Sequence, residues 1–190
     1  MIHVVRATDN LAVEMAFREL EVIPAWQIQL AYDRGLGLYV LDHDTRASYI
    51  GLCDKDDLQT GDDRTWDDSD MAWFDSDINT IVIYRQLLFQ DEEFKVMRHE
   101  FAHALDWMLG NDSWFTESEA FDRYWKRGTP LDRYAATNPL EYFAQGYEAS
   151  FREERVPCEI YYEHTRAGLA RRDPELFALI SSMEQQEFVL

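Results

Sequence analysis

Apolar residues recur along the chain with spacings that distinguish strands from helices. Residues 38–41 and 80–84 are short apolar stretches rich in β-branched and aromatic side chains, which is typical of buried strands. Residues 48–52 show a similar pattern and are predicted to form another strand. A first helix is expected from Asn10, a good capping residue, and a short second helix from Pro24.

The strongest helical pattern lies in the middle of the chain. Asp91 can cap this helix and Gly110 can end it. Further helices are expected at Asn138 and Asp173, because each is a capping residue followed by proline, which suits the first helical position. The central helix carries an apolar stripe at spacings of three and four residues, formed by Phe94, Met97, Phe101, Leu105 and Met108.

Residues 54–77 are rich in aspartate and predict a long irregular loop. Trp66, Trp73 and Phe74 are interleaved with these acidic residues. A solvated acidic surface accounts for this composition, and a calcium site is the alternative. The aspartate spacing lacks the glycine and the closing glutamate of an EF-hand loop, so the motif does not favour calcium.

The 190 residues, 46% of them hydrophobic, predict one globular domain over positions 1–190. No apolar run has the length needed to cross a bilayer, so no membrane partner is expected. Residues 1–6 lack a signal-peptide pattern, which favours a cytoplasmic protein, with a secreted or injected protein as the alternative. Cys53 and Cys158 are expected to be unpaired.

The net charge is −19, from 37 acidic and 18 basic residues. A surface of this charge repels phosphate backbones, so nucleic acid is excluded as an expected partner. The charge is compatible with a basic peptide or protein substrate, and it also favours solubility. Nothing in the pattern indicates an oligomeric state.

Residues 99–103 read H-E-F-A-H within the central helix. Residues four apart lie one helical turn apart on the same face, so His99 and His103 can reach a single ion. Imidazole nitrogens suit Zn²⁺, and this spacing is typical of metallopeptidases. Glu100 is offset from both histidines and is predicted to act as the general base on a water molecule.

Two histidines leave zinc short of protein ligands. A metzincin would have glycine and histidine where this chain has Asp106 and Leu109, so that class is excluded. The other histidines belong to no motif; they are His3, His43 and His164. A carboxylate from a later helix is therefore the expected third ligand.

Glu141, in the first turn of the helix after Asn138, is the preferred third ligand, and Glu148, two turns further on, is the alternative. Glu141 could instead serve only as a capping glutamate at the third helical position. Asp106 shares the face of the two histidines. It is expected either to orient an imidazole or to pair with an arginine near the helix end.

Residues 98–106, R-H-E-F-A-H-A-L-D, together with residues 134–144, Y-A-A-T-N-P-L-E-Y-F-A, resemble two related zincin families. One contains the anthrax lethal factor catalytic domain and the Pro-Pro endopeptidases, and the other contains the Mlc titration factor A peptidases. The resemblance spans roughly residues 80–151. It implies an α+β fold in which a small twisted sheet packs on the helix bearing the two histidines and a second helix bears the third ligand.

By the same resemblance, Glu141 corresponds to the third zinc ligand and Tyr134 to a tyrosine that steadies the oxyanion. The implied activity is zinc-dependent hydrolysis of a peptide or protein, with residues 81–83 pairing with the substrate if they form an edge strand. Two alternatives remain. One is a regulatory binding protein on a zincin scaffold, because Mlc titration factor relatives bind a transcriptional repressor. The other is a toxin-like protease that acts on one specific protein.

Overall fold

The computed structural model describes residues 2–7, 9–53, 65, 67, 71–89, 95–153 and 163–185. The strands are β1 (His3–Ala7), β2 (Gly37–Leu41), β3 (Ala72–Asp75) and β4 (Thr80–Tyr84). The α-helices are α1 (Asn10–Leu20), α2 (Ala25–Asp33), α3 (Arg85–Phe89), α4 (Val96–Leu109), α5 (Glu119–Arg127), α6 (Pro139–Ser150), α7 (Arg166–Arg172) and α8 (Pro174–Glu184). Two short 3₁₀ helices are η1 (Ala47–Ile50) and η2 (Phe115–Glu117).

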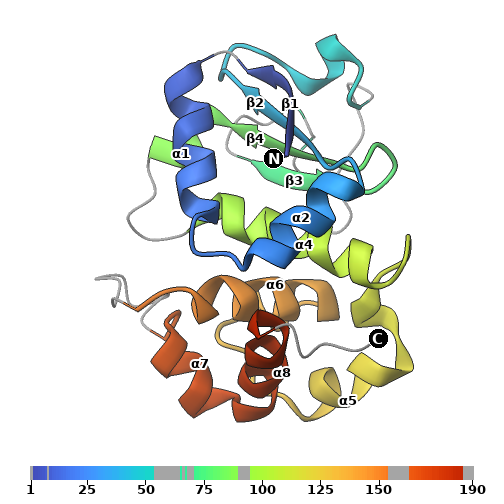
Figure 1. The fold of residues 1–190 in the computed structure, drawn as a ribbon, viewed down its shortest axis with the longest axis vertical. Coiled ribbons are helices and arrows are strands. Elements are labelled where there is room, and N and C mark those ends of the chain that lie inside the picture. The colour runs from blue at the N-terminus through green and yellow to red at the C-terminus, as the bar shows by residue number, and fades with distance from the viewer. Residues whose placement is uncertain are drawn as a thin grey trace.

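The strands form one sheet in the order β1-β2-β4-β3 (Figure 1). β1, β2 and β4 run parallel, with Leu38 opposite Ile81, whereas β3 pairs antiparallel with β4. The turn between β3 and β4 contains Asn79 at φ +48°, a left-handed conformation that asparagine tolerates better than most residues. This topology places β4 inside the sheet and β3 at one edge.

Side chains along β2 and β4 alternate between two hydrophobic clusters, because successive residues of a strand point to opposite faces. Leu38, Val40, Ile81 and Ile83 belong to the main core on the helical face. The intervening side chains form a smaller cluster on the other face, where η1 packs; its buried members are Leu41, Ala47, Trp73, Val82 and Tyr84.

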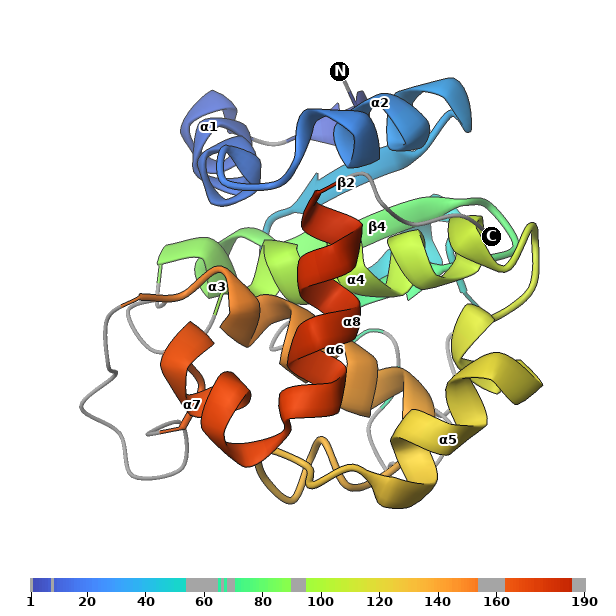
Figure 2. The same ribbon diagram turned by 60° about the horizontal axis from the view of Figure 1, so that its bottom comes forward.

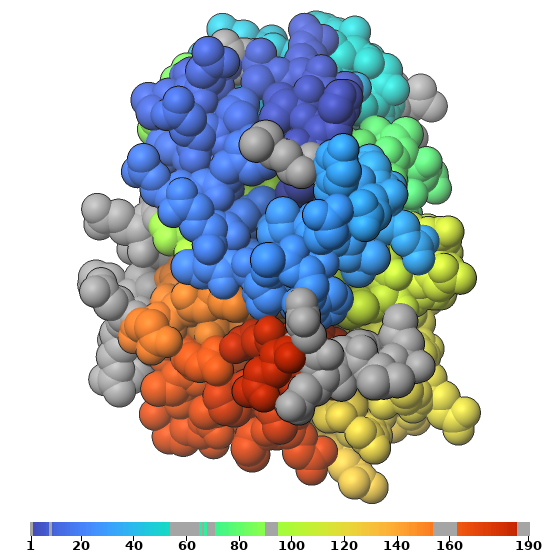
Figure 3. Space-filling model, viewed as in Figure 1, coloured from blue at the N-terminus to red at the C-terminus, as the bar shows by residue number. Residues whose placement is uncertain are grey.

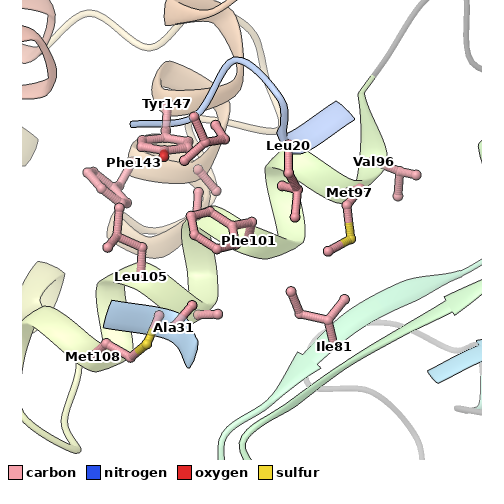
Figure 4. Close-up of a cluster of buried hydrophobic side chains, with 14 of the residues drawn as sticks. Leu20, Ala31, Ile81, Val96, Met97, Phe101, Leu105, Met108, Phe143 and Tyr147 are labelled. Atoms are coloured by element: carbon pink, nitrogen blue, oxygen red, sulfur yellow. The ribbon is translucent and has the colours of Figure 1, made fainter. Parts of the chain in front are cut away.

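Helix α4 lies between the sheet and α6, so one helix is buried on almost all sides (Figures 1 and 2). Phe101 and Leu105 of α4 face Phe143 and Tyr147 of α6 in the main core (Figure 4). Burying a side chain of this size stabilises the fold by about 1.5–3 kcal/mol relative to exposing it. This packing fixes the distance between the two helices that carry the candidate ligands.

The N-terminal part of the chain is tied directly to the C-terminal helices. Trp26 Nε1 in α2 donates to the carbonyl of Met183 in α8 over 2.9 Å, and the Tyr147 hydroxyl hydrogen-bonds Gln27. Figure 3 shows the blue α2 segment seated against the orange and red helices. The layer formed by α6, α7 and α8 is therefore joined to α2 as well as to α4.

Most of the expected elements are confirmed. The strands at 38–41 and 80–84 and the helices opening at Asn138 and Asp173 are present, and both capping side chains accept a backbone N–H. The first two helices are also present, although Asp9, not Asn10, caps the first. Gly110 follows the last residue of α4 as expected. The α+β architecture, with its small sheet packed on α4, is the expected one.

Some expectations were wrong. Residues 48–52 do not form a strand, because the chain adopts the 3₁₀ turn η1, which ends at Gly51 with φ +76°. The loop expected over 54–77 contains β3. Much of that loop, with most of the calcium hypothesis, lies outside the described residues, as does the cap expected at Asp91.

Residues 81–83 were expected to meet the substrate if they formed an edge strand. They belong to β4, which is hydrogen-bonded to β2 on one side and to β3 on the other. Their backbone is therefore occupied, and the edge beside α4 belongs to β3. In the segments that the structure describes, no helix combines the length and apolar character that crossing a bilayer requires.

Candidate metal centre

His99 and His103 lie one turn apart on α4 and point in the same direction. Both are buried, and their Nε2 atoms are 3.1 Å apart. Their rings meet edge to face with centroids 4.8 Å apart. The four-residue spacing therefore brings two potential metal-binding nitrogens together, as the sequence predicts.

Glu141 reaches this pair from α6. The Asn138 side chain accepts the Glu141 backbone N–H over 2.9 Å, and Pro139 occupies the start of the helix, so the first turn is firmly built. The Glu141 Oε2 atom lies 3.0 Å from His99 Nε2 and 3.5 Å from His103 Nε2. Its carboxylate thus faces the imidazoles, and the structure brings together the three residues expected to bind zinc.

The carboxylate and imidazoles change one another's protonation. Burial alone would raise the pKa of Glu141, but hydrogen bonds and charge from His103 and His99 hold it well below its usual range. Burial alone would lower the pKa of His103, but the hydrogen bond and charge of Glu141, with the charges of Glu100 and Asp106, raise it to about 9. In the metal-free protein, the pair therefore holds an ionised carboxylate beside a protonated imidazole.

The donor set fits a metal ion. Two imidazole nitrogens and one carboxylate oxygen lie within 4.8 Å of one another. Among the residues described, this is the one group of three or more such side chains that could hold an ion. Catalytic zinc sites use such a set of two nitrogens and one oxygen from the protein and keep the fourth position open for water or substrate.

Glu100 is buried beside the two histidines. Burial is the largest influence on its carboxyl and raises its pKa, while the charges of His99 and His103 and a backbone hydrogen bond at Phe74 act in the opposite direction. Phe74 belongs to β3, so the edge strand of the sheet contacts the candidate base. A carboxylate whose pKa is raised in this way is suited to accept and release a proton.

Tyr134 lies at the open side of the site. Its ring centroid is 6.1 Å from that of His99, and 51% of the residue is exposed. A core tyrosine would be largely enclosed, whereas this ring combines solvent access with proximity to a candidate ligand. Trp114 lies near the other histidine, with its ring 6.5 Å from that of His103. No motif in the sequence indicated Trp114.

Asp106 follows neither of the two expectations for it. It accepts the Thr116 backbone N–H over 2.8 Å and the Thr116 hydroxyl over 2.7 Å. Burial raises the pKa of Asp106 to about 6, against the effect of these hydrogen bonds. Asp106 therefore anchors η2, the short turn that follows Trp114, to the end of the ligand-bearing helix.

Glu148, the alternative third ligand, lies elsewhere. Its side chain is fully buried and its Oε1 atom accepts from Arg152 over 2.7 Å and from the Lys95 backbone N–H over 3.3 Å. Its second oxygen is 3.9 Å from Nδ1 of the buried His164. Glu148 therefore belongs to a separate polar cluster, which the sequence did not predict.

No protein-family model matches the sequence, and no curated protein matches it. The structure is similar to that of the Pro-Pro endopeptidase PPEP-2 from Paenibacillus alvei, with a TM-score of 0.66 and 18% sequence identity. The match covers 95% of this chain and 96% of that one. At this identity the similarity establishes the fold, and the expected zincin-like α+β domain is confirmed. The more particular resemblances to lethal factor and to Mlc titration factor A stay predictions.

Proposed function

We propose that this protein is a zinc-dependent peptidase, with His99, His103 and Glu141 as zinc ligands and Glu100 as the general base. The observation that carries the proposal is the convergence of two buried imidazoles from α4 and a partly buried carboxylate from α6, whose ligand atoms lie within 4.8 Å of one another. Glu100 is buried next to them on the same helix. The fold shared with a Pro-Pro endopeptidase supports the same class of activity.

Zinc, when bound, polarises the scissile carbonyl and lowers the pKa of a water molecule. Glu100 takes the proton of the attacking water and passes it to the nitrogen of the leaving amine. Its buried position suits this role, because the raised pKa brings the carboxyl closer to neutrality and makes the second transfer easier. The phenol of Tyr134 donates a hydrogen bond to the carbonyl oxygen as it gains negative charge.

The substrate is expected to run along β3. This strand is at the end of the four-stranded order, and its residue Phe74 contacts Glu100. An extended peptide pairing with an edge strand would make backbone hydrogen bonds there, which holds the scissile bond beside the base. Backbone hydrogen bonds do not depend on the sequence of the peptide, so the choice of substrate depends on the side chains around the site.

Metal analysis and peptide cleavage test the proposal together. The purified protein is expected to contain one zinc per chain and to cut members of a peptide library, which should include sequences with adjacent prolines. His99→Ala should lose both zinc and cleavage. His43→Ala is the matched control, because its exposed side chain contacts only Asp42 and Asp44 among the described ion pairs, and it should keep both.

Two results would overturn the proposal. Full zinc occupancy in His99→Ala would remove the ligand assignment. Stoichiometric zinc in a wild-type protein that cuts no library peptide and no protein substrate would favour a binding protein on a zincin scaffold.

A further inference from the structure

Four ionisable side chains form a chain of neighbours apart from the proposed metal centre, in the order Asp132, His164, Glu148 and Arg152. His164 is completely buried, with Nε2 2.9 Å from Asp132 Oδ2 and Nδ1 3.9 Å from Glu148 Oε2. Glu148 pairs in turn with Arg152. Burial alone would lower the pKa of His164, but its interactions with Asp132 and Glu148 raise it above its usual value. The imidazole therefore lies between two carboxylates whose burial without a partner would be costly.

Asp132 also controls the backbone of the turn that carries Tyr134. Its Oδ1 atom accepts the Ala135 N–H over 2.7 Å, and the Tyr134 backbone also hydrogen-bonds its carboxyl group. The Tyr134 carbonyl accepts both the N–H and the hydroxyl of Thr137. Because about half of the Tyr134 residue is exposed, core packing restrains it little, and this backbone framework helps to set where the ring lies relative to His99.

We infer that His164, acting through Asp132, is a positioning residue for Tyr134. One oxygen of Asp132 is held by His164, and the other holds the turn. Removing His164 takes away the side-chain partner of the carboxylate, so the carboxylate is expected to rotate toward water and to hold the turn less firmly. The phenol then no longer lies at a fixed position beside the ligand. This inference rests on the proposed peptidase function for its kinetic consequence.

A double-mutant cycle tests the coupling. His164→Gln in the wild-type background should lower kcat about 10–100-fold on a verified peptide, with zinc content unchanged, because small displacements of a catalytic group have effects of this size. The same substitution in a Tyr134→Phe background should have no further effect on kcat. Equal losses in the two backgrounds would overturn the inference, because they would show that His164 acts independently of the phenol.

Asp132→Asn is a second variant in case His164→Gln folds poorly. It keeps an oxygen for the Ala135 N–H and weakens the link to His164, so its kcat loss should also vanish in the Tyr134→Phe background. Tyr147→Phe is the matched control for lost stability, because it removes the buried hydrogen bond from Tyr147 in α6 to Gln27 in α2 and changes none of the hydrogen bonds of Asp132 or His164 described above. It should lower the melting temperature and leave kcat unchanged.

A spectroscopic measurement needs no substrate. In protein labelled with 3-fluorotyrosine, the ¹⁹F resonance of Tyr134 is identified by its absence from Tyr134→Phe. In His164→Gln this resonance should shift and narrow, while that of the exposed Tyr32 stays in place. A shifted resonance in a protein that cuts nothing would refute the peptidase and retain the positioning. An unchanged Tyr134 resonance would refute the positioning, whatever the activity.

Discussion

Replacing Glu100 with glutamine separates catalysis from folding. The amide has nearly the same shape as the carboxylate and keeps one oxygen for the hydrogen bond at the Phe74 backbone. It cannot accept a proton from water. Because none of the three proposed ligands is changed, Glu100→Gln is expected to bind zinc like the wild type and to lose hydrolysis.

Glu100→Gln should affect the rate of hydrolysis and the stability differently. Loss of a general base lowers the rate by about 10²–10⁴-fold, which corresponds to roughly 2.7–5.4 kcal/mol in the activation free energy. The stability, unlike the rate, should not decrease. The folded-state pKa of Glu100 is raised, so the folded metal-free protein disfavours the charge once the pH exceeds the ordinary value of 4.5. A neutral amide removes this penalty, and the free energy of unfolding at pH 7 should not fall.

The assay combines steady-state cleavage of a verified peptide, zinc quantification and urea unfolding of the metal-free protein. Glu19→Gln is the matched control, because Glu19 is another buried glutamate and accepts the Met97 backbone N–H over 2.9 Å. It should lose some stability and keep its kcat. A Glu100→Gln protein with normal turnover, or with normal zinc and a large loss of stability, would refute the role given to Glu100.

Three further outcomes follow from the same geometry. Glu141→Ala should lose zinc, whereas Glu148→Ala should keep zinc and lose about 3–5 kcal/mol of stability, because it breaks a buried ion pair; metal analysis and urea unfolding distinguish them. Tyr134→Phe should keep zinc and lower kcat about 10²–10³-fold with little change in KM, and a wild-type kcat would remove the phenol from the reaction. Because the pKa of His164 is raised in the fold, its stabilising contribution is present in full below its ordinary pKa of 6.5 and is lost as the pH rises through the folded value. The stability difference between wild type and His164→Gln should therefore shrink at alkaline pH. At a pH below 3.8, the ordinary pKa of aspartate, protonation of Asp132 should weaken the same link. A difference in urea unfolding that does not change with pH would contradict this.

The parts of the site that could be predicted depend on neighbours in the sequence. The i, i+4 histidines required only a helix, and the apolar stripe of α4 predicted one. Glu141 was placed by the Asn138 cap and the proline after it, which fix the first turn of α6 by local hydrogen bonding. Its place in that first turn made Glu141 the preferred third ligand over Glu148, the family resemblance implied the same residue, and the structure places Glu141 beside the histidines.

The missed parts depend on contacts between distant residues. β1 is mostly exposed and shows no apolar alternation, so only its pairing with β2 identifies it as a strand. Residues 48–52 have strand-like side chains, but the chain there forms a 3₁₀ turn. From this turn and the residues after it, the side chains of Ala47, Ile50 and Leu52 pack against the sheet. The link between Asp132 and His164 joins residues 32 positions apart. Neither residue belongs to a sequence motif, so no local pattern predicts that they pair.

The arrangement of His99, His103 and Glu141 has a consequence for how a cation would bind at the proposed site. Two bare imidazole nitrogens 3.1 Å apart would repel through their lone pairs, so a proton must occupy the space between these groups when no cation does. Because the pKa of His103 is raised to about 9, a cation that binds to this imidazole near neutral pH would have to displace a proton. Cation binding at the proposed site is therefore expected to weaken as the pH falls.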